Sequence, residues 1–155
     1  MNPTITSIQL CVGHRDPMKK VTNAQVKERF GIEGDRHATS TGVRQARQVL
    51  LMDQKTLTSF GLIPGQIREN ITTDGIELHS LAEGQHIILG SDVVLRITGH
   101  CAPCARMDEI SPGLQERLEK QRGMLATVIQ GGTIRIGDEI NLVDSTEDGF
   151  TCSLT

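Results

Sequence analysis

Two cysteines and their charged neighbours are the part of the sequence best suited to chemistry. Residues 99–110 read GHCAPCARMDEI, with Cys101 and Cys104 three positions apart, His100 directly before them and Arg106 shortly after. A thiolate is a soft metal ligand and a sulfur nucleophile, and positive charge nearby favours it. The pair could therefore hold a structural metal, run a dithiol–disulfide cycle, or present one thiolate to a soft metal or to a sulfur atom.

These uses differ in what else they require from the chain. A structural zinc site usually takes four ligands, and besides the adjacent His100 only scattered residues such as Cys11, His14 and His37 are available to complete one. A thioredoxin-like dithiol lies at a strand–helix junction in an alternating βαβ chain, a pattern that is missing here. Alternatively, Cys101 and Cys104 are ordinary small loop residues. We favour one reactive thiolate, with His100 raising its thiolate fraction or transferring protons, or else simply exposed.

Composition narrows the class of protein. The chain has 155 residues, the size of one domain, with a net charge of −3, no Trp or Tyr and three Phe. Single-stranded nucleic-acid binders need aromatic platforms and positive charge, so we expect no nucleic-acid partner. The first residues lack the pattern of a signal peptide, and no apolar run is long enough for a membrane span. We therefore expect a cytoplasmic protein, not bound to a membrane, with reduced thiols.

Arginine is the preferred basic residue, since eleven of the 16 basic residues are Arg. A guanidinium matches phosphate and carboxylate oxygens in a bidentate way, whereas a Lys ammonium is a point charge. Codon bias would explain the excess equally well. The functional interpretation is that several arginines converge on an anionic ligand.

Short apolar stretches with period two dominate the chain and predict strands at 7–12, 46–52 and 66–73. Residues 86–98 predict a hairpin, and 125–143 predict further strands with Gly-containing turns between them. We therefore expect a mainly β (α+β) fold, either a β-barrel or a β-sandwich, with two or three short peripheral helices.

Two helices have recognisable ends. Asp53 can cap a helix through residue 60 that Gly61 terminates, and Ser111 can cap a second helix that Gly123 stops. The last residues, 144–155, are polar and aperiodic. We predict a single domain over residues 1–143 followed by a polar tail. Exposed strand edges in such a small fold also favour a homodimer.

Five segments, in order along the chain, carry a family resemblance. They are GIEGDRHA (31–38), RQVLLMD (47–53), PGQIRENITTDGIEL (64–78), LAEGQHIILGSDVVLRITGHCAPCARMD (81–108) and RGMLATVIQGGTIRIGDEI (122–140). Together they resemble the MOSC domain, the module named for the C-terminal part of molybdenum cofactor sulfurases, in its stand-alone form. The resemblance implies a MOSC-type β-barrel.

The resemblance also singles out one cysteine. The family's functional cysteine lies in a Pro-Cys-x-x-hydrophobic context, which Pro103 to Met107 match, so Cys104 rather than Cys101 is the candidate. In some relatives this cysteine ligates molybdenum held by a pterin dithiolene, and the enzyme reduces N-hydroxylated compounds. In other stand-alone members it is thought to carry sulfur. Because the larger reductases have an extra N-terminal β-barrel that this chain lacks, the resemblance supports cofactor binding more than it supports reductase activity.

A bound pterin cofactor would need partners for its terminal phosphate. The arginines in or beside the matching segments are the candidates, and we predict that at least two of them face the ligand: Arg36, Arg44, Arg68 and Arg122. In the predicted strand 66–73, Asn70 lies opposite Ile67 and Ile71. It would therefore face outward or into a cleft, where its amide binds pterin edges or the backbone.

Two functions follow from this assignment of Cys104. The first is binding of the molybdenum–pterin cofactor through the Cys104 thiolate, with reduction of small N-hydroxylated compounds if a separate reductase supplies electrons. The alternative is a non-enzymatic carrier that holds a persulfide on Cys104, loaded by a cysteine desulfurase, with Cys101 attacking to release the sulfur.

Overall fold

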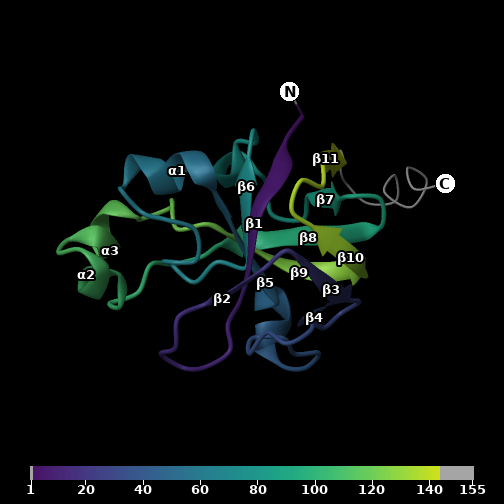
Figure 1. Ribbon diagram of the computed structural model, residues 1–155, viewed down its shortest axis with the longest axis horizontal. Helices are drawn as coiled ribbons and strands as arrows, with labels where there is room; N and C mark the ends of the chain where they lie inside the picture. Colours follow the sequence, from purple (N-terminus) through teal and green to yellow (C-terminus); the bar gives the residue numbers. More distant parts are fainter. Residues whose placement is uncertain (1, 144–155) are drawn as a thin grey trace.

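A computed structural model describes residues 2–143, apart from the side chains of Val43 and Arg44 (Figure 1). The predicted tail, 144–155, lies outside the described residues. Strands predominate and the helices are short, as the sequence predicted. No helix in residues 2–143 is both long and apolar enough to cross a membrane.

Eight strands form the main sheet. Their order across the sheet is β11-β7-β8-β9-β5-β6-β1-β2. The bounds are Ile140–Val143 for β11, His86–Leu89 for β7, Val93–His100 for β8, Met124–Gln130 for β9, Val49–Asp53 for β5, Ile71–Asp74 for β6, Thr4–Leu10 for β1 and Lys19–Val21 for β2. All pairings are antiparallel except that of β5 with β6.

A second, three-stranded sheet has the order β10-β3-β4, with β10 at Gly132–Arg135, β3 at Asn23–Lys27 and β4 at Gly31–Ile32. The chain passes from β9 into this sheet at Gly131, where a Cβ would collide with the carbonyl oxygen of Val26. The strands predicted in 125–143 are present, but they do not pair with one another in sequence order, because β10 pairs with β3 and β11 pairs with β7.

The main sheet does not close into the barrel that the resemblance implied. Its strand order ends at β11 on one side and at β2 on the other. One isolated bridge, between Thr4 and Glu139, brings β1 against the start of β11, and Ile5 N–H donates to the Asp138 carbonyl at 2.9 Å. The sheet is thus strongly curled, with a single bridge rather than a ladder between these segments.

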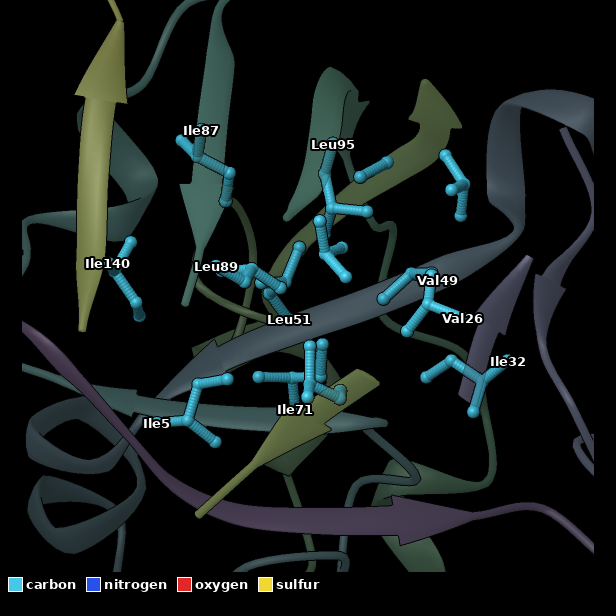
Figure 2. Close-up of a cluster of buried hydrophobic side chains, with 14 of the residues drawn as sticks. Ile5, Val26, Ile32, Val49, Leu51, Ile71, Ile87, Leu89, Leu95 and Ile140 are labelled. Carbon is cyan, nitrogen blue, oxygen red and sulfur yellow. The ribbon is translucent and has the colours of Figure 1, made fainter. Parts of the chain in front are cut away.

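An aliphatic core fills the curl of the sheet. Ile5, Leu51, Ile71, Ile87 and Leu89 come from four strands and converge there (Figure 2). The strand β5 supplies the centre, because pairing on both edges leaves all five of its residues buried. With no Trp or Tyr available, branched aliphatic side chains provide the apolar area that stabilises the fold.

The helices pack against a second apolar cluster around Met52 of β5. Helix α1 is Gln54–Ser59, α2 is Met107–Ile110 and α3 is Leu114–Arg117, and the 3₁₀ helices η1 and η2 span Val43–Arg47 and Leu78–Ser80. In Figure 1, α2 and α3 lie at the end of the molecule away from β7 and β11. The Asp53 cap on α1 is confirmed, with Thr56 N–H donating to its carboxylate at 2.8 Å.

The second predicted helix is shorter than expected. Gly113, at φ 81, precedes α3 in the left-handed region, so Ser111 is not the N-cap and the chain makes two separate turns of helix. The predicted strand 66–73 is also wrong over its first half. Arg68 has φ 69, and β6 begins only at Ile71.

Candidate functional site

A cleft of about 190 Å³ opens at the point where the loop after β8 meets β5 and the start of β9. Its lining combines both cysteines of the pair with cationic and apolar side chains: His37, Arg47, Leu50, Arg68, Asn70, Cys101, Cys104, Arg106, Met107, Arg122 and Leu125. Four of these are arginines, and none is Asp or Glu among the residues that the structure describes. The cleft therefore favours an anionic ligand.

Cys101 lies deep in the cleft, held by both backbone and side-chain contacts. Its backbone N–H donates to the Gly123 carbonyl at 2.9 Å, and only 2% of its surface is exposed. Arg122 Nη1 lies 2.7 Å from the Cys101 sulfur, and Arg122 Nη2 donates to the Ile67 carbonyl at 3.0 Å. A guanidinium donor in this position is a counter-charge for a thiolate.

The backbone around Gly123 explains how Arg122 reaches this position. Gly123 has φ 111, and a Cβ there would collide with the Leu51 carbonyl oxygen, so only glycine lets β9 approach β5 this closely. Arg122 is buried at 8% exposure, and its Nε has no hydrogen-bond partner among the described residues. One donor of the guanidinium is therefore uncommitted.

Glu69 lies within electrostatic range of Arg122 and is fully buried. Glu69 Oε2 accepts hydrogen bonds from Gly65 N–H and the Thr72 hydroxyl, both at 2.9 Å, while Oε1 has no partner among the described residues. Burial raises the pKa of the Glu69 carboxyl, and the hydrogen bonds together with the Arg122 charge offset only part of that increase. Burial thus favours the neutral form of the Glu69 carboxyl, although the arginines of the cleft lie nearby.

Asn70 lines the cleft, but the protein itself uses most of its amide. Both amide hydrogens are engaged, since Nδ2 donates to the Gln9 carbonyl at 3.2 Å and to Asp35 Oδ1 at 2.9 Å. Asn70 Oδ1 accepts from Leu50 N–H at 3.0 Å. Only one oxygen lone pair remains. The arrangement matches the expected backbone-bonding role, and the side chain is buried rather than directed outward.

Arg68 clamps the loop that follows β1. Its Nη2 lies 3.1 Å from the sulfur of buried Cys11 and 2.9 Å from the Gly13 carbonyl, while Nη1 donates to the Asp16 carbonyl at 2.8 Å. These three contacts occupy both terminal nitrogens. Arg68 therefore lines the cleft mainly as a structural residue.

Three residues of the cleft lining make few or no hydrogen bonds to the rest of the described protein. Cys104 is exposed in the loop before α2. Arg106 Nη1 makes a single long hydrogen bond, 3.3 Å, to the His14 carbonyl. The exposed Arg47, at the end of η1, makes no hydrogen bond or ion pair with the residues that the structure describes. Sequence reasoning missed Arg47, because nothing in its spacing indicates that η1 turns this side chain toward the cysteines.

Other predicted site residues lie away from the cleft. His100 is exposed and stacks on His79, with ring centroids 6.1 Å apart, because successive residues at the end of β8 face opposite sides. Arg36 is exposed and is not part of the lining. The Arg44 side chain lies outside the described residues. Of the four predicted arginines, the structure therefore brings Arg68 and Arg122 to the cleft.

The histidine under His100 belongs to a separate group behind the cleft. His79 Nε2 accepts the Gly123 N–H at 2.8 Å, and its Nδ1 lies 3.4 Å from Asp53 Oδ1. Burial raises the pKa of Asp53, but hydrogen bonds from His79 and Thr56 outweigh it and hold that pKa below its usual value. His79 thereby supports the glycine that positions Arg122.

The structural-zinc interpretation lacks a ligand set in the described part of the chain. Within residues 2–143, no three His, Cys, Asp or Glu side chains come together in a group that could hold a metal ion. Cys104 remains available as a single soft ligand to a metal carried by another group.

Comparison with known families decides the classification. The family model described as MOSC domain matches residues 45–141, more than half of the chain, including both cysteines of the pair. The chain belongs to the MOSC domain family. No curated protein sequence matches it significantly. The match confirms the resemblance inferred from the five sequence segments.

Solved structures share this MOSC fold at low sequence identity. The YuaD protein of Bacillus subtilis superposes with a TM-score of 0.76 at 21% identity, covering 94% of this chain and 98% of YuaD. YiiM of Geobacillus stearothermophilus gives 0.72 at 16% identity, covering 92% of this chain and 75% of YiiM. YiiM of Escherichia coli gives 0.69 at 15% identity, covering 94% and 72%. At these identities the likeness concerns the fold alone.

Proposed function

We propose that this MOSC domain binds a molybdenum–pterin cofactor, with the Cys104 thiolate as the protein ligand to the metal. The observation that carries the proposal is the cleft itself, which combines an exposed thiol with four arginines and, among residues 2–143, no carboxylate. A soft sulfur ligand suits the metal, and guanidinium groups suit the cofactor's phosphate. The unpartnered Nε of buried Arg122 is the kind of donor that an anionic ligand would satisfy.

The arginines that we assign to the phosphate differ from those expected from the sequence. Arg68 is committed to Cys11, Gly13 and Asp16, whereas Arg47 and Arg106 retain most of their donors. We therefore assign the phosphate to Arg47 and Arg106 in place of Arg36 and Arg68. At about 190 Å³ the cleft is smaller than the roughly 300–1,000 Å³ usual for small-molecule sites. It would therefore enclose only part of the cofactor, which Cys104 and the arginines would hold.

When bound, the cofactor would supply a metal centre able to exchange an oxygen atom with small N-hydroxylated compounds. The chain's own part is to bind and orient: Cys104 fixes the metal, and the arginines neutralise the charge of the ligand. Electrons would come from a separate reductase, because no flavin or nicotinamide motif is visible in the sequence.

Molybdenum content per chain tests the proposal. The full chain and its Cys104→Ser, Cys101→Ser and Arg47→Gln variants would be purified without air from a host that makes the cofactor. We expect molybdenum in the wild type and in Cys101→Ser, its absence in Cys104→Ser, and a reduced amount in Arg47→Gln. Absence of molybdenum and of pterin fluorescence from all four proteins would contradict the proposal.

The second candidate is a sulfur carrier that holds a persulfide on Cys104. It is favoured by one observation that cofactor binding does not need, the presence of a second, buried thiol in the same cleft beside a guanidinium. A cysteine desulfurase would load Cys104, which is exposed enough for contact with a protein donor. Mass spectrometry after incubation with a desulfurase should show a one-sulfur adduct that Cys104→Ser abolishes.

A further inference from the structure

We propose that the cleft is a sulfurtransferase site for small anionic sulfane-sulfur donors such as thiosulfate, in which Cys104 accepts the sulfur and Cys101 releases it as sulfide. The proposal rests on the sulfur-carrier function and adds a substrate class and a release step. Both thiols line one cleft, three residues apart, but in different settings: Cys104 is exposed and Cys101 is 2% exposed.

The size and charge of the cleft define the donor class. A volume of about 190 Å³ suits a small ion, and the four arginines of the lining suit a dianion with several oxygen acceptors. Arg47 and Arg106 retain free donors at the same cleft as Cys104, and buried Arg122 contributes the unpartnered Nε. Thiosulfate combines small size, two negative charges, sulfonate-like oxygens and a transferable sulfur atom.

The first step transfers sulfur to Cys104. The Cys104 thiolate attacks the outer sulfur of thiosulfate, so that a sulfur–sulfur bond forms to Cys104 and the sulfur–sulfur bond of thiosulfate breaks. Sulfite leaves with the bonding electron pair, and Cys104 carries a persulfide. The arginines would hold the sulfite oxygens as that charge develops, and the total charge is unchanged by the step.

The second step uses the buried thiol. The Cys101 thiolate attacks Cys104 Sγ, the bond between Cys104 Sγ and the outer sulfur breaks, and hydrosulfide leaves after taking up one proton. The transferred sulfur is reduced to sulfide, and the two cysteines are oxidised to a disulfide. An external dithiol then reduces the disulfide and completes the cycle. Arg122 Nη1, 2.7 Å from Cys101 Sγ, provides the counter-charge for the attacking thiolate.

The chain contains a matched control for Cys101. Cys11 is equally buried, at 1% exposure, and its sulfur also lies beside a guanidinium, 3.1 Å from Arg68 Nη2. Cys11 is not part of the cleft lining. A general effect of removing a buried, arginine-contacted thiol should therefore appear in Cys11→Ser as well, whereas a release role should appear only in Cys101→Ser.

The experiment follows sulfite and sulfide from the full chain mixed with thiosulfate, first without and then with dithiothreitol. The wild type and Cys11→Ser should release sulfite and sulfide. Cys104→Ser should release neither. Before dithiothreitol is added, Cys101→Ser should still release one sulfite per chain and accumulate a one-sulfur adduct on Cys104, but it should release no sulfide. Arg47→Gln should raise the KM for thiosulfate about tenfold, the cost of one lost contact worth 1.4 kcal/mol, while Arg135→Gln on β10 should not.

Three results would overturn parts of the proposal separately. Loading of Cys104 by a cysteine desulfurase but not by thiosulfate would reject the donor class and leave the carrier function standing. Loading by neither would reject both. Equal sulfide release from wild type and Cys101→Ser before dithiothreitol is added would reject the release step. Peptide mapping of the wild type after one turnover checks that step without a variant, since it must show a Cys101–Cys104 disulfide.

Discussion

Two buried cysteines near the cleft each lie beside an arginine, yet the protein treats the two guanidinium groups differently. Arg68, beside Cys11, also donates to two backbone carbonyls and is only partly buried. Arg122, beside Cys101, donates to one carbonyl, is almost fully buried, and keeps an unpartnered Nε. The first arginine closes a loop, whereas the second has hydrogen-bonding capacity left over for a ligand.

The difference follows from the backbone that carries each arginine. Arg68 sits at positive φ in a tight turn, so its side chain folds back over the loop after β1. Arg122 precedes a glycine pressed against β5, which leaves the guanidinium under the cleft with few carbonyls in reach. Similar pairs thus differ in what they leave over: one closes a loop, and the other keeps an unpartnered donor under the cleft.

The largest expected effect on stability is at Asn70, whose side chain lies between the region of Arg68 and Cys11 and the region of Arg122 and Cys101. Asn70→Ala would remove bonds to Leu50, Gln9 and Asp35 and leave buried groups unsatisfied, so we expect a loss of about 3 kcal/mol in the free energy of unfolding. Urea denaturation measures it. The exposed Asn141→Ala on β11 is the control and should change stability by less than about 0.5 kcal/mol. A loss in the free energy of unfolding below 1 kcal/mol for Asn70→Ala would mean that the Asn70 bonds contribute little to holding the two regions together.

Replacing each arginine by Met separates the two pairs directly. Arg122→Met should cost about 2–3 kcal/mol, because the buried Ile67 carbonyl and the Glu69 carboxyl both lose a cationic neighbour. Arg68→Met should cost about 1 kcal/mol, because its partly exposed carbonyl partners can bond water instead. Equal costs in denaturant titrations would show that Arg122 is as purely structural as Arg68.

Glu69 should give the Arg122 region a distinct pH dependence. Because burial raises its folded-state pKa, its contribution to stability is fully present below the unfolded value, near 4.3, and is lost as the pH rises through the folded value. Glu69→Gln removes that loss. The variant should therefore gain stability relative to wild type with rising pH, measured as the free energy of unfolding from pH 4 to 8; a flat difference would contradict this.

Asp53, behind the cleft, should show the opposite sign. Its folded-state pKa is lowered, so its stabilisation is present above the unfolded value, near 3.9, and disappears as the pH falls through the folded value. Asp53→Asn should therefore lose stability at neutral pH and converge with wild type in acid. The effect should be smaller than that of Asn70→Ala, because Thr56 N–H keeps an oxygen acceptor in Asn.

The smallest effect on stability is expected at Cys104. Since the side chain is exposed, Cys104→Ser should change the free energy of unfolding by less than about 0.5 kcal/mol. Among the three cysteines that the structure describes, it should nevertheless remove the one that iodoacetamide alkylates fastest. Exposure places Cys104 first, and access through the cleft places Cys101 before Cys11, because the two buried thiols are about equally exposed. Faster modification of Cys11 than of Cys101 would mean that the more accessible of the two buried thiols lies beside Arg68 rather than in the cleft.

Local pattern determined a large part of this protein. The apolar stretch at 46–52, the hairpin at 86–98 and the Asp53 cap are all present, because each depends on periodicity or capping within a short segment. The Pro103-Cys104 context, together with four other segments, was enough to identify the family.

Only the tertiary structure decided which residues share the cleft. Alternation predicted that Asn70 would face outward or into a cleft, and it does line the cleft. A turn at Arg68 precedes β6, however, and the amide is buried in bonds to three other segments. Arg47 joins the site through η1, and His100 leaves it because Cys101, one residue later, faces the other way. These outcomes depend on contacts between residues far apart in the chain, which local periodicity does not encode.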